Sequence, residues 1–239
     1  MAHRAVRFPA PESNSAPSRI SVTSRSGRVE VTASPRADIE VEGARRAELG
    51  RDAGIDQVVV SATHEPIVVR CPVGTDVIIG TLSGRVELSG RFGAVRITTS
   101  SGRVDVGEAT SVDVRTRSGT IRVARCDGVV RARSTSARMT VEAAAQLDAA
   151  TASGAITAGS IDDATVQSTS GRVELGLNGD GSVAARTVSG RVEISVPPGA
   201  RPEMALHSVS GRIDTSIESG HDGIVGVETV SGRIRVWAR

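Results

Sequence analysis

The stretch Ser83-Gly84-Arg85-Val86-Glu87-Leu88 recurs along the chain and decides the fold. Its opening, Ser-Gly-Arg followed by Val or Ile, also begins at Ser26, Ser101, Ser170, Ser189, Ser210 and Ser231. Weaker copies begin at Ser118, Ser136 and Ser153. We predict a structural corner at Ser83-Gly84, Ser101-Gly102, Ser118-Gly119, Ser170-Gly171, Ser189-Gly190, Ser210-Gly211 and Ser231-Gly232. A recurring motif of this kind predicts an array of similar structural units.

The spacing of the corners sets the architecture. Between residues 84 and 232 the corners follow one another at steps of 17 to 21 residues. Apolar residues stand seven and five positions before each corner Gly or Ala and two and four positions after it, with Thr215 as the exception, and a Ser or Thr stands three before it. This alternation predicts two short strands per repeat, each with one inward face. A propeller blade needs about 40 residues, so the pattern favours a parallel β-solenoid, a single-stranded β-helix of about ten coils, right-handed as parallel crossovers are.

The repeat is interrupted once. Gly27 and Gly84 lie 57 residues apart with no corner motif between them. Alternating apolar residues predict strands near 39–41, 58–60 and 67–69, and the charged stretch 43–54 predicts an exposed loop. We therefore expect three regions: a flexible, proline-bearing lead-in over 1–18, a first coil with an irregular β cap over 19–76, and regular repeats over 77–239.

Composition limits the function classes. The net charge is +2 and every basic side chain is Arg, which gives no strong attraction to nucleic acid. Cys71 and Cys126 stand far apart, which favours two buried thiols in a reducing compartment. Residues 1–18 contain no apolar signal region, and no stretch approaches the roughly 20 apolar residues of a membrane span. We predict a cytoplasmic protein, and peripheral membrane association stays open.

The whole chain resembles the bacterial DUF4097 family of β-strand-repeat proteins, some of which are labelled adhesin candidates. The resemblance rests on the Ser-Gly corners from Ser26 to Ser231 and on the proline-bearing lead-ins at 68–74 and 194–200. Many members carry Asp where this chain has Arg after the glycine. The resemblance implies a β-solenoid with an irregular N-terminal section, and it implies no catalytic residues.

The Arg after each corner is the most specific candidate for function. In a solenoid these side chains would form a column: Arg28, Arg85, Arg103, Arg138, Arg172, Arg191, Arg212 and Arg233. Such a column could bind anions. A carboxylate follows two residues later at Glu30, Glu87, Asp105, Glu174, Glu193 and Asp214. Residues i and i+2 share a strand face, so we favour a structural charge ladder.

Other side chains offer less. Acidic residues on the variable spacers, such as Asp162 and Asp163, fit turn chemistry, although carbohydrate-cleaving β-helices also gather carboxylates. The four histidines have no metal-ligand spacing, and no nucleophile elbow or phosphate loop is present. We predict no catalytic residue, no metal site and no cofactor. The strand after Gly232 ends the chain, so we expect an open edge there, with Trp237 either as a plug or in an end-to-end interface.

Three functions remain in consideration. The first is a non-enzymatic structural or interaction module, a rigid scaffold for a protein partner or for self-assembly, with a homo-oligomer formed through the end of the solenoid. The second is a carbohydrate-binding or polysaccharide-acting β-helix protein. The third is a peripheral binder of an anionic surface through the Arg column. The near absence of aromatic residues weighs against single-stranded nucleic acid.

Overall fold

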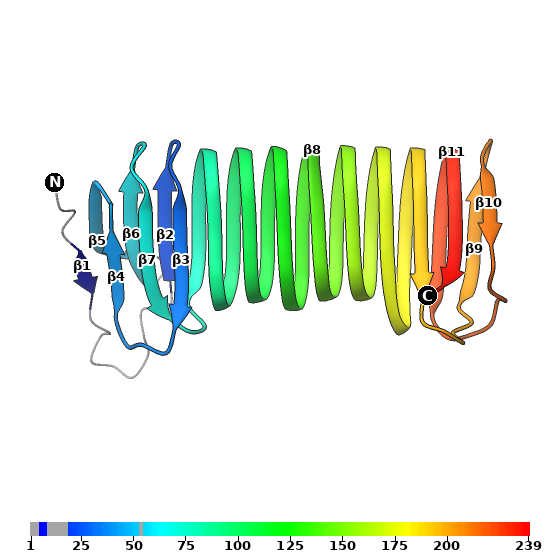
Figure 1. The fold of residues 1–239 in the computed structure, drawn as a ribbon, viewed down its shortest axis with the longest axis horizontal. Helices are drawn as coiled ribbons and strands as arrows, with labels where there is room; N and C mark the ends of the chain where they lie inside the picture. The colour runs from blue at the N-terminus through cyan, green and yellow to red at the C-terminus, as the bar shows by residue number, and fades with distance from the viewer. Residues whose placement is uncertain (1–4, 9–18, 53–54) are drawn as a thin grey trace. The chain divides into compact units, whose positions relative to one another are not determined.

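The protein is built from β-strands and connecting segments, as the repeat predicts. The computed structural model describes residues 5–8, 19–52 and 55–239 (Figure 1). Its strands are β1 (Val6–Phe8), β2 (Arg19–Ser24), β3 (Val29–Ser34), β4 (Ile39–Glu42), β5 (Arg46–Asp52), β6 (Ile55–Ala62), β7 (Ile67–Pro72), β8 (Asp76–Val196), β9 (Glu203–Ser208), β10 (Arg212–Thr215) and β11 (Ile224–Ala238). The described chain contains no helix, and hence none long and apolar enough to cross a bilayer. The all-β prediction is confirmed.

Most of the Ser-Gly corners lie within one continuous strand, β8, rather than in separate turns. Its 121 residues run through successive Ser-Gly corners without a break and turn back and forth in Figure 1. Where β11 pairs with β8 in parallel, Ser231 lies beside Ser189 and Gly232 beside Gly190. Corners of neighbouring repeats therefore stack on one another, and the hydrogen-bond ladder passes through them.

The chain divides into two compact units, Met1–Thr116 and Arg117–Arg239. In the N-terminal unit, β2 and β3 form the first repeat, and its neighbours are not in chain order. Each strand pairs in parallel with β8 on one side, and on the other β2 pairs with β6 and β3 with β7. The insert thus returns outside the first repeat, and the first repeat lies inside the sheet.

Antiparallel strands cover the outer repeat of the N-terminal unit. β4 pairs with β7 and is itself paired by β1, while β5 pairs with β6. The strands predicted near 39–41, 58–60 and 67–69 are confirmed as β4, β6 and β7. One expectation is wrong here: residues 46–52 form β5 rather than a loop. Residues 6–8 of the predicted lead-in form β1, and positions 1–4 and 9–18 of that lead-in lie outside the described residues.

The C-terminal unit repeats the change of order. β11 pairs in parallel with the last part of β8 on one side and with β9 and β10 on the other (Figure 1). The chain leaves β8 at Val196 and forms the outer repeat β9–β10. It then returns as β11, which lies between β8 and that outer repeat. The prediction of an open edge at the last strand is therefore wrong, because the open edge belongs to β9 and β10.

The core follows the predicted alternation. Inward side chains are Val, Ile, Leu and Ala with relative exposures near zero, for example Val86, Val173 and Ile234. The Ser or Thr three residues before the corner also faces inward and is buried at Ser24, Thr81, Thr99, Thr116, Thr151, Ser168, Thr187 and Thr229. Thin layers of small side chains fill this core, which explains how a chain with so few aromatic residues folds.

Candidate functional site

The corner glycines are required by close approach of neighbouring backbones. A Cβ built at Gly171 would overlap the carbonyl oxygen of Gly154, and one at Gly232 would overlap that of Gly190. The inward hydroxyl three residues earlier narrows the space further, since Thr229 Oγ1 would lie 3.0 Å from a Cβ at Gly232. The corner motif is thus a packing device. Its serines lie at or near the surface, exposed at Ser83, Ser101, Ser170, Ser189, Ser210 and Ser231 and half-buried at Ser118.

The predicted charge ladder is continuous in the N-terminal unit. Arg28 bonds Glu30 through Nε at 2.5 Å and Glu87 through Nη2 at 2.5 Å, so it bridges two carboxylates that are register partners on adjacent strands. Arg85 then pairs with Glu87. Arg103 pairs with Asp105 at 2.7 Å. The hydrogen bond from Arg28 holds the pKa of Glu87 below its ordinary value.

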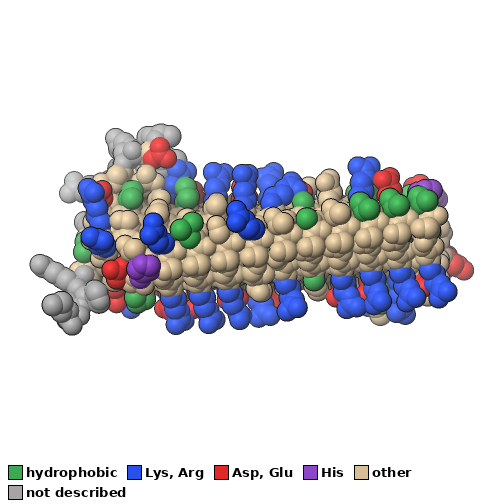
Figure 2. All heavy atoms as spheres, turned by 90° about the horizontal axis from the view of Figure 1, so that it is seen from above, with side chains coloured by type: hydrophobic (Ala, Val, Ile, Leu, Met, Phe, Trp, Pro, Cys, Tyr) green, Lys and Arg blue, Asp and Glu red, His purple; other side chains and the backbone are tan. Residues whose placement is uncertain are grey.

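The ladder is broken in the C-terminal unit. Arg172 pairs with Glu174 at 3.1 Å, as predicted. For Arg191, Arg212 and Arg233, no ion pair within 4 Å is formed with any described residue, although Glu193 and Asp214 stand at the predicted spacing. Figure 2 shows basic side chains repeated along this edge. The pairing prediction is wrong for Arg191 and Arg212, and this edge keeps an excess of positive charge.

Trp237 does not plug the end of the sheet. It is half-buried on β11 beside Ser195 of β8, and the guanidinium of Arg235 stacks over its ring, 5.2 Å from the centroid. The chain end is held in place by Arg239, whose Nη2 donates to the carbonyl oxygen of Leu177 at 2.6 Å. Trp237 therefore stabilises an inner strand through a cation–π contact.

The spacer carboxylates serve turn chemistry. Asp163 accepts the backbone N–H of Ser182 at 3.0 Å, and Asp162 accepts the side-chain amide of Asn178 at 3.3 Å. Within the described ranges, no three His, Cys, Asp or Glu side chains gather so as to hold a metal ion. The structure thus gives the acidic spacers a local structural role.

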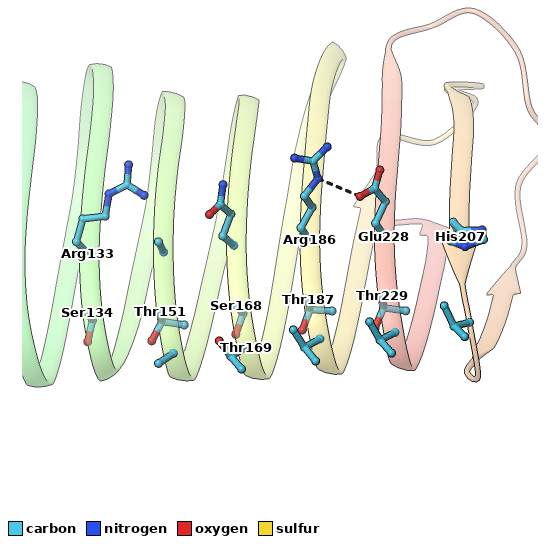
Figure 3. A pocket seen from close by; sticks show the side chains of 16 residues that line it. Arg133, Ser134, Thr151, Ser168, Thr169, Arg186, Thr187, His207, Glu228 and Thr229 are labelled. Carbon is cyan, nitrogen blue, oxygen red and sulfur yellow. Dashed lines mark hydrogen bonds and ion pairs between the residues drawn. The ribbon is translucent and has the colours of Figure 1, made fainter.

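A groove of about 760 Å³ in the C-terminal unit was not predicted (Figure 3). One row of its side chains is charged or polar and includes Arg133, Arg186, Glu228 and His207. Arg186 Nε donates to Glu228 at 3.0 Å. A second, inward row carries the buried hydroxyls of Thr151, Ser168, Thr187 and Thr229 and the half-buried hydroxyl of Ser134. The groove therefore has a charged side and a side formed by the strand corners.

Three valines give this groove an apolar strip. Val188, Val230 and Val209 are 51%, 50% and 70% exposed. Val188 lies on β8, Val230 on the adjacent strand β11, and Val209 directly after β9, the next strand in that order. Each stands two residues before a corner glycine, an outward position that four of the other seven repeats fill with Ser, Thr or Ala. The Val-Ser-Gly triplets at 188, 209 and 230 could have revealed this strip from the sequence, because an apolar residue at an outward position departs from the alternation of apolar and polar residues.

Together, these features define an all-β repeat protein. The chain belongs to the Toastrack DUF4097 family, whose model matches residues 18–236. The resemblance found in the sequence is therefore confirmed over nearly the whole chain.

Solved structures share the fold at low sequence identity. A protein from Parabacteroides distasonis described as an adhesin candidate has a TM-score of 0.52 and 12% identity, with 95% of this chain and 96% of that chain covered. One from Parabacteroides merdae, described in the same way, has a TM-score of 0.50 and 8% identity, with 96% of each chain covered. No curated protein matches the sequence. These likenesses establish the fold alone.

Proposed function

We propose that this protein is a non-enzymatic interaction module, a rigid scaffold that presents the groove of its C-terminal unit to a protein partner. The observation that carries the proposal is the strip of exposed valines at 188, 230 and 209. Soluble proteins seldom expose adjacent apolar side chains without a binding role. The adhesin description of the structural neighbours also favours contact with another molecule.

The chemistry of the groove suits a protein surface. Protein interfaces combine an apolar centre with a polar rim. Here the valines supply the apolar centre, and the ion pair between Arg186 and Glu228 lies beside them on the rim. Branched aliphatic side chains cannot form hydrogen bonds with the hydroxyl groups of a sugar, so we rank a carbohydrate partner lower.

The scaffold in this proposal is a parallel β-solenoid of about ten coils with right-handed winding. Parallel register between β8 and each of β2, β3 and β11 supports it. We extend the proposal to a cytoplasmic location, supported by the two buried thiols of Cys71 and Cys126.

A second candidate function is attachment to an anionic surface. It is supported by the row of Arg191, Arg233 and Arg212, which carries more positive charge than its recorded ion pairs balance. Binding to phosphatidylserine vesicles at low salt, and its loss in Arg191→Gln/Arg233→Gln, would favour this candidate. No binding at low salt would eliminate it.

Site-directed photocross-linking tests the proposed function. A photoreactive residue at Val230 should capture a discrete protein in the cells that make this chain, and Val188→Asp should abolish the capture. The matched control is Leu82, which is 52% exposed at the same repeat position in the N-terminal unit but has no apolar neighbours in its row. Equal capture from positions 82 and 230, or none from 230, would overturn the proposal.

A further inference from the structure

The outer repeat of the C-terminal unit leaves part of its core uncovered. Met204 and Leu206 of β9 are half-buried and Ile213 of β10 is 39% exposed. The side chains at the same repeat positions on β11, Val225, Val227 and Ile234, are completely buried. The apolar side chains of the outer repeat are thus more exposed than those of the enclosed repeat beside it.

The backbone of β9 also has a free edge. Among the described strands, β9 pairs with β11 alone. Glu203 donates its N–H to Gly223 at 2.9 Å, on the β11 side. Because backbone groups alternate along a strand, those of Met204 and Leu206 point away from β11. The start of this edge is met by the 219–220 segment: the Met204 N–H donates to the Ser219 hydroxyl at 3.4 Å, and the Pro202 carbonyl oxygen accepts the Gly220 N–H at 3.1 Å. A pairing strand would displace this segment and replace its bonds.

The sequence of β9 is complementary to itself in an antiparallel arrangement. With Ala205 opposite Ala205 of a second copy, Met204 lies opposite Leu206 and Glu203 opposite His207. The first pair continues the core and the second places a carboxylate beside an imidazole. In this register, Met204 and Leu206 exchange ladder hydrogen bonds across the edge, and Ala205 occupies the position without such bonds.

The charges on the outer face support the same register. Arg186, Glu228 and His207 lie beside one another on adjacent strands, and the row stops at His207 because no strand follows. Glu203 forms no ion pair within 4 Å with any described residue. In the paired state, Glu203 of the second copy extends the row beyond His207 with a negative charge.

We propose that the free edge of β9 pairs with β9 of a second copy of this chain, in an antiparallel, twofold-symmetric dimer centred on Ala205. The proposal rests on the proposed scaffold function and names one partner for it. The twofold axis closes the assembly at two chains, because each copy uses its free β9 edge once.

Charge exchange tests the register. In sedimentation experiments on the full chain from micromolar to millimolar concentration, the natural protein should dimerise reversibly. Glu203→Lys and His207→Glu should each raise the dimer dissociation constant about 10-fold, because the first removes the carboxylate from two symmetric carboxylate–imidazole pairs and the second places two carboxylates opposite each other in both pairs. The double variant should recover much of the loss. Glu142→Lys, an exposed change elsewhere in the C-terminal unit, should have no effect.

Cross-linking supplies a readout that does not depend on charge. Ala205→Cys should form an intermolecular disulfide with itself, since residues opposite each other without ladder bonds lie about 4.5 Å apart between Cα atoms. Ala184→Cys stands at the same repeat position on β8, is also exposed, and should not. A protein that remains monomeric, a dimer insensitive to Glu203→Lys, or open-ended polymers would overturn the dimer. Capture from Val230 would be unchanged by such a result, so the two proposals fail separately.

Discussion

In both the N-terminal unit and the C-terminal unit, an outer repeat encloses the repeat nearest the chain terminus. The two units differ in whether further strands cover that outer repeat. In each, the repeat nearest the chain terminus lies inside, between β8 and an outer repeat. In the N-terminal unit the outer strands β6 and β7 are covered by antiparallel β5 and β4. In the C-terminal unit no described strand covers β9 or β10.

This difference separates two problems that an end of a repeat array must solve. Enclosing the terminal strand holds the chain end in place, because both of its edges are hydrogen-bonded. Covering the outermost edge prevents association with other chains. The N-terminal unit covers its outer parallel strands with β4 and β5, so that its edges are the antiparallel strands β1 and β5, whereas in the C-terminal unit the parallel strands β9 and β10 are themselves edges. An interaction surface at β9 is therefore consistent with the rest of the fold.

The largest expected effect concerns the enclosed strand at the C-terminal end. Gly232→Val should lower the free energy of unfolding by about 3 kcal/mol, because the new side chain overlaps the backbone of Gly190 and Thr229 Oγ1. Gly211→Val in the outer repeat should cost less, since that repeat has one neighbour and can shift outward.

Urea denaturation of the C-terminal variants measures both changes. Gly80→Val is the control, because a Cβ at Gly80 has no atom within 4 Å and its φ is not in the left-handed region. Equal losses at 211 and 232 would contradict the distinction between enclosed and outer repeats.

The next effect concerns the cover of the N-terminal end. Val41 is buried on β4 between Val6 of β1 and Val69 of β7. Val41→Asp should destabilise this cover by about 2 kcal/mol, because an unpaired carboxylate is buried. Amide hydrogen exchange along β7 should accelerate, and the exposed edge should make the protein associate at high concentration. Leu49→Asp, at a side chain 56% exposed on β5, should leave exchange and association unchanged.

The N-terminal unit should also be the more sensitive to acid. Glu65 accepts the backbone N–H groups of Thr63 and His64 at 3.0 Å each. The hydrogen bond from its own backbone N–H, together with these two, lowers the pKa of its carboxyl to about 2. A lowered folded-state pKa gives stability that is present above the ordinary value of 4.5 and is lost as pH falls toward 2.

Glu65→Gln should therefore reduce the dependence of the urea midpoint on pH between these limits. Glu142→Gln, whose carboxylate accepts no recorded backbone N–H, is the comparison variant. An unchanged slope in Glu65→Gln would show that the 63–65 corner does not contribute to acid sensitivity.

The smallest effect is a change of labelling rate. Cys71 is buried on β7, and burial raises the pKa of its thiol to about 11. At pH 8 the thiol stays protonated and enclosed, so iodoacetamide should react only when β7 opens. Val41→Asp should accelerate the reaction. Rapid alkylation of the unaltered protein would mean that the N-terminal cover opens readily.

Much of the repeat could be predicted because it depends on local alternation. The inward positions of Val86, Val173 and Ile234 follow from the two-residue period of a strand. The ion pairs of Arg28 and Arg103 follow from the spacing to Glu30 and Asp105. The failure at Arg191 and Arg212 has a physical reason, since an exposed pair gains little energy and the side chains need not adopt the paired geometry.

By itself, the sequence determined which residues face inward, where the corners lie and that the chain is all-β. The order of the terminal repeats was decided by the tertiary structure alone. Any two repeats with the same corner spacing can pair through their backbones, so the hydrogen-bond ladder does not specify which repeat is the neighbour. The choice depends on how connections such as 197–202 and 216–223 cross the end of the sheet. That choice encloses β11 and leaves β9, with Glu203, Ala205 and His207, as the exposed edge.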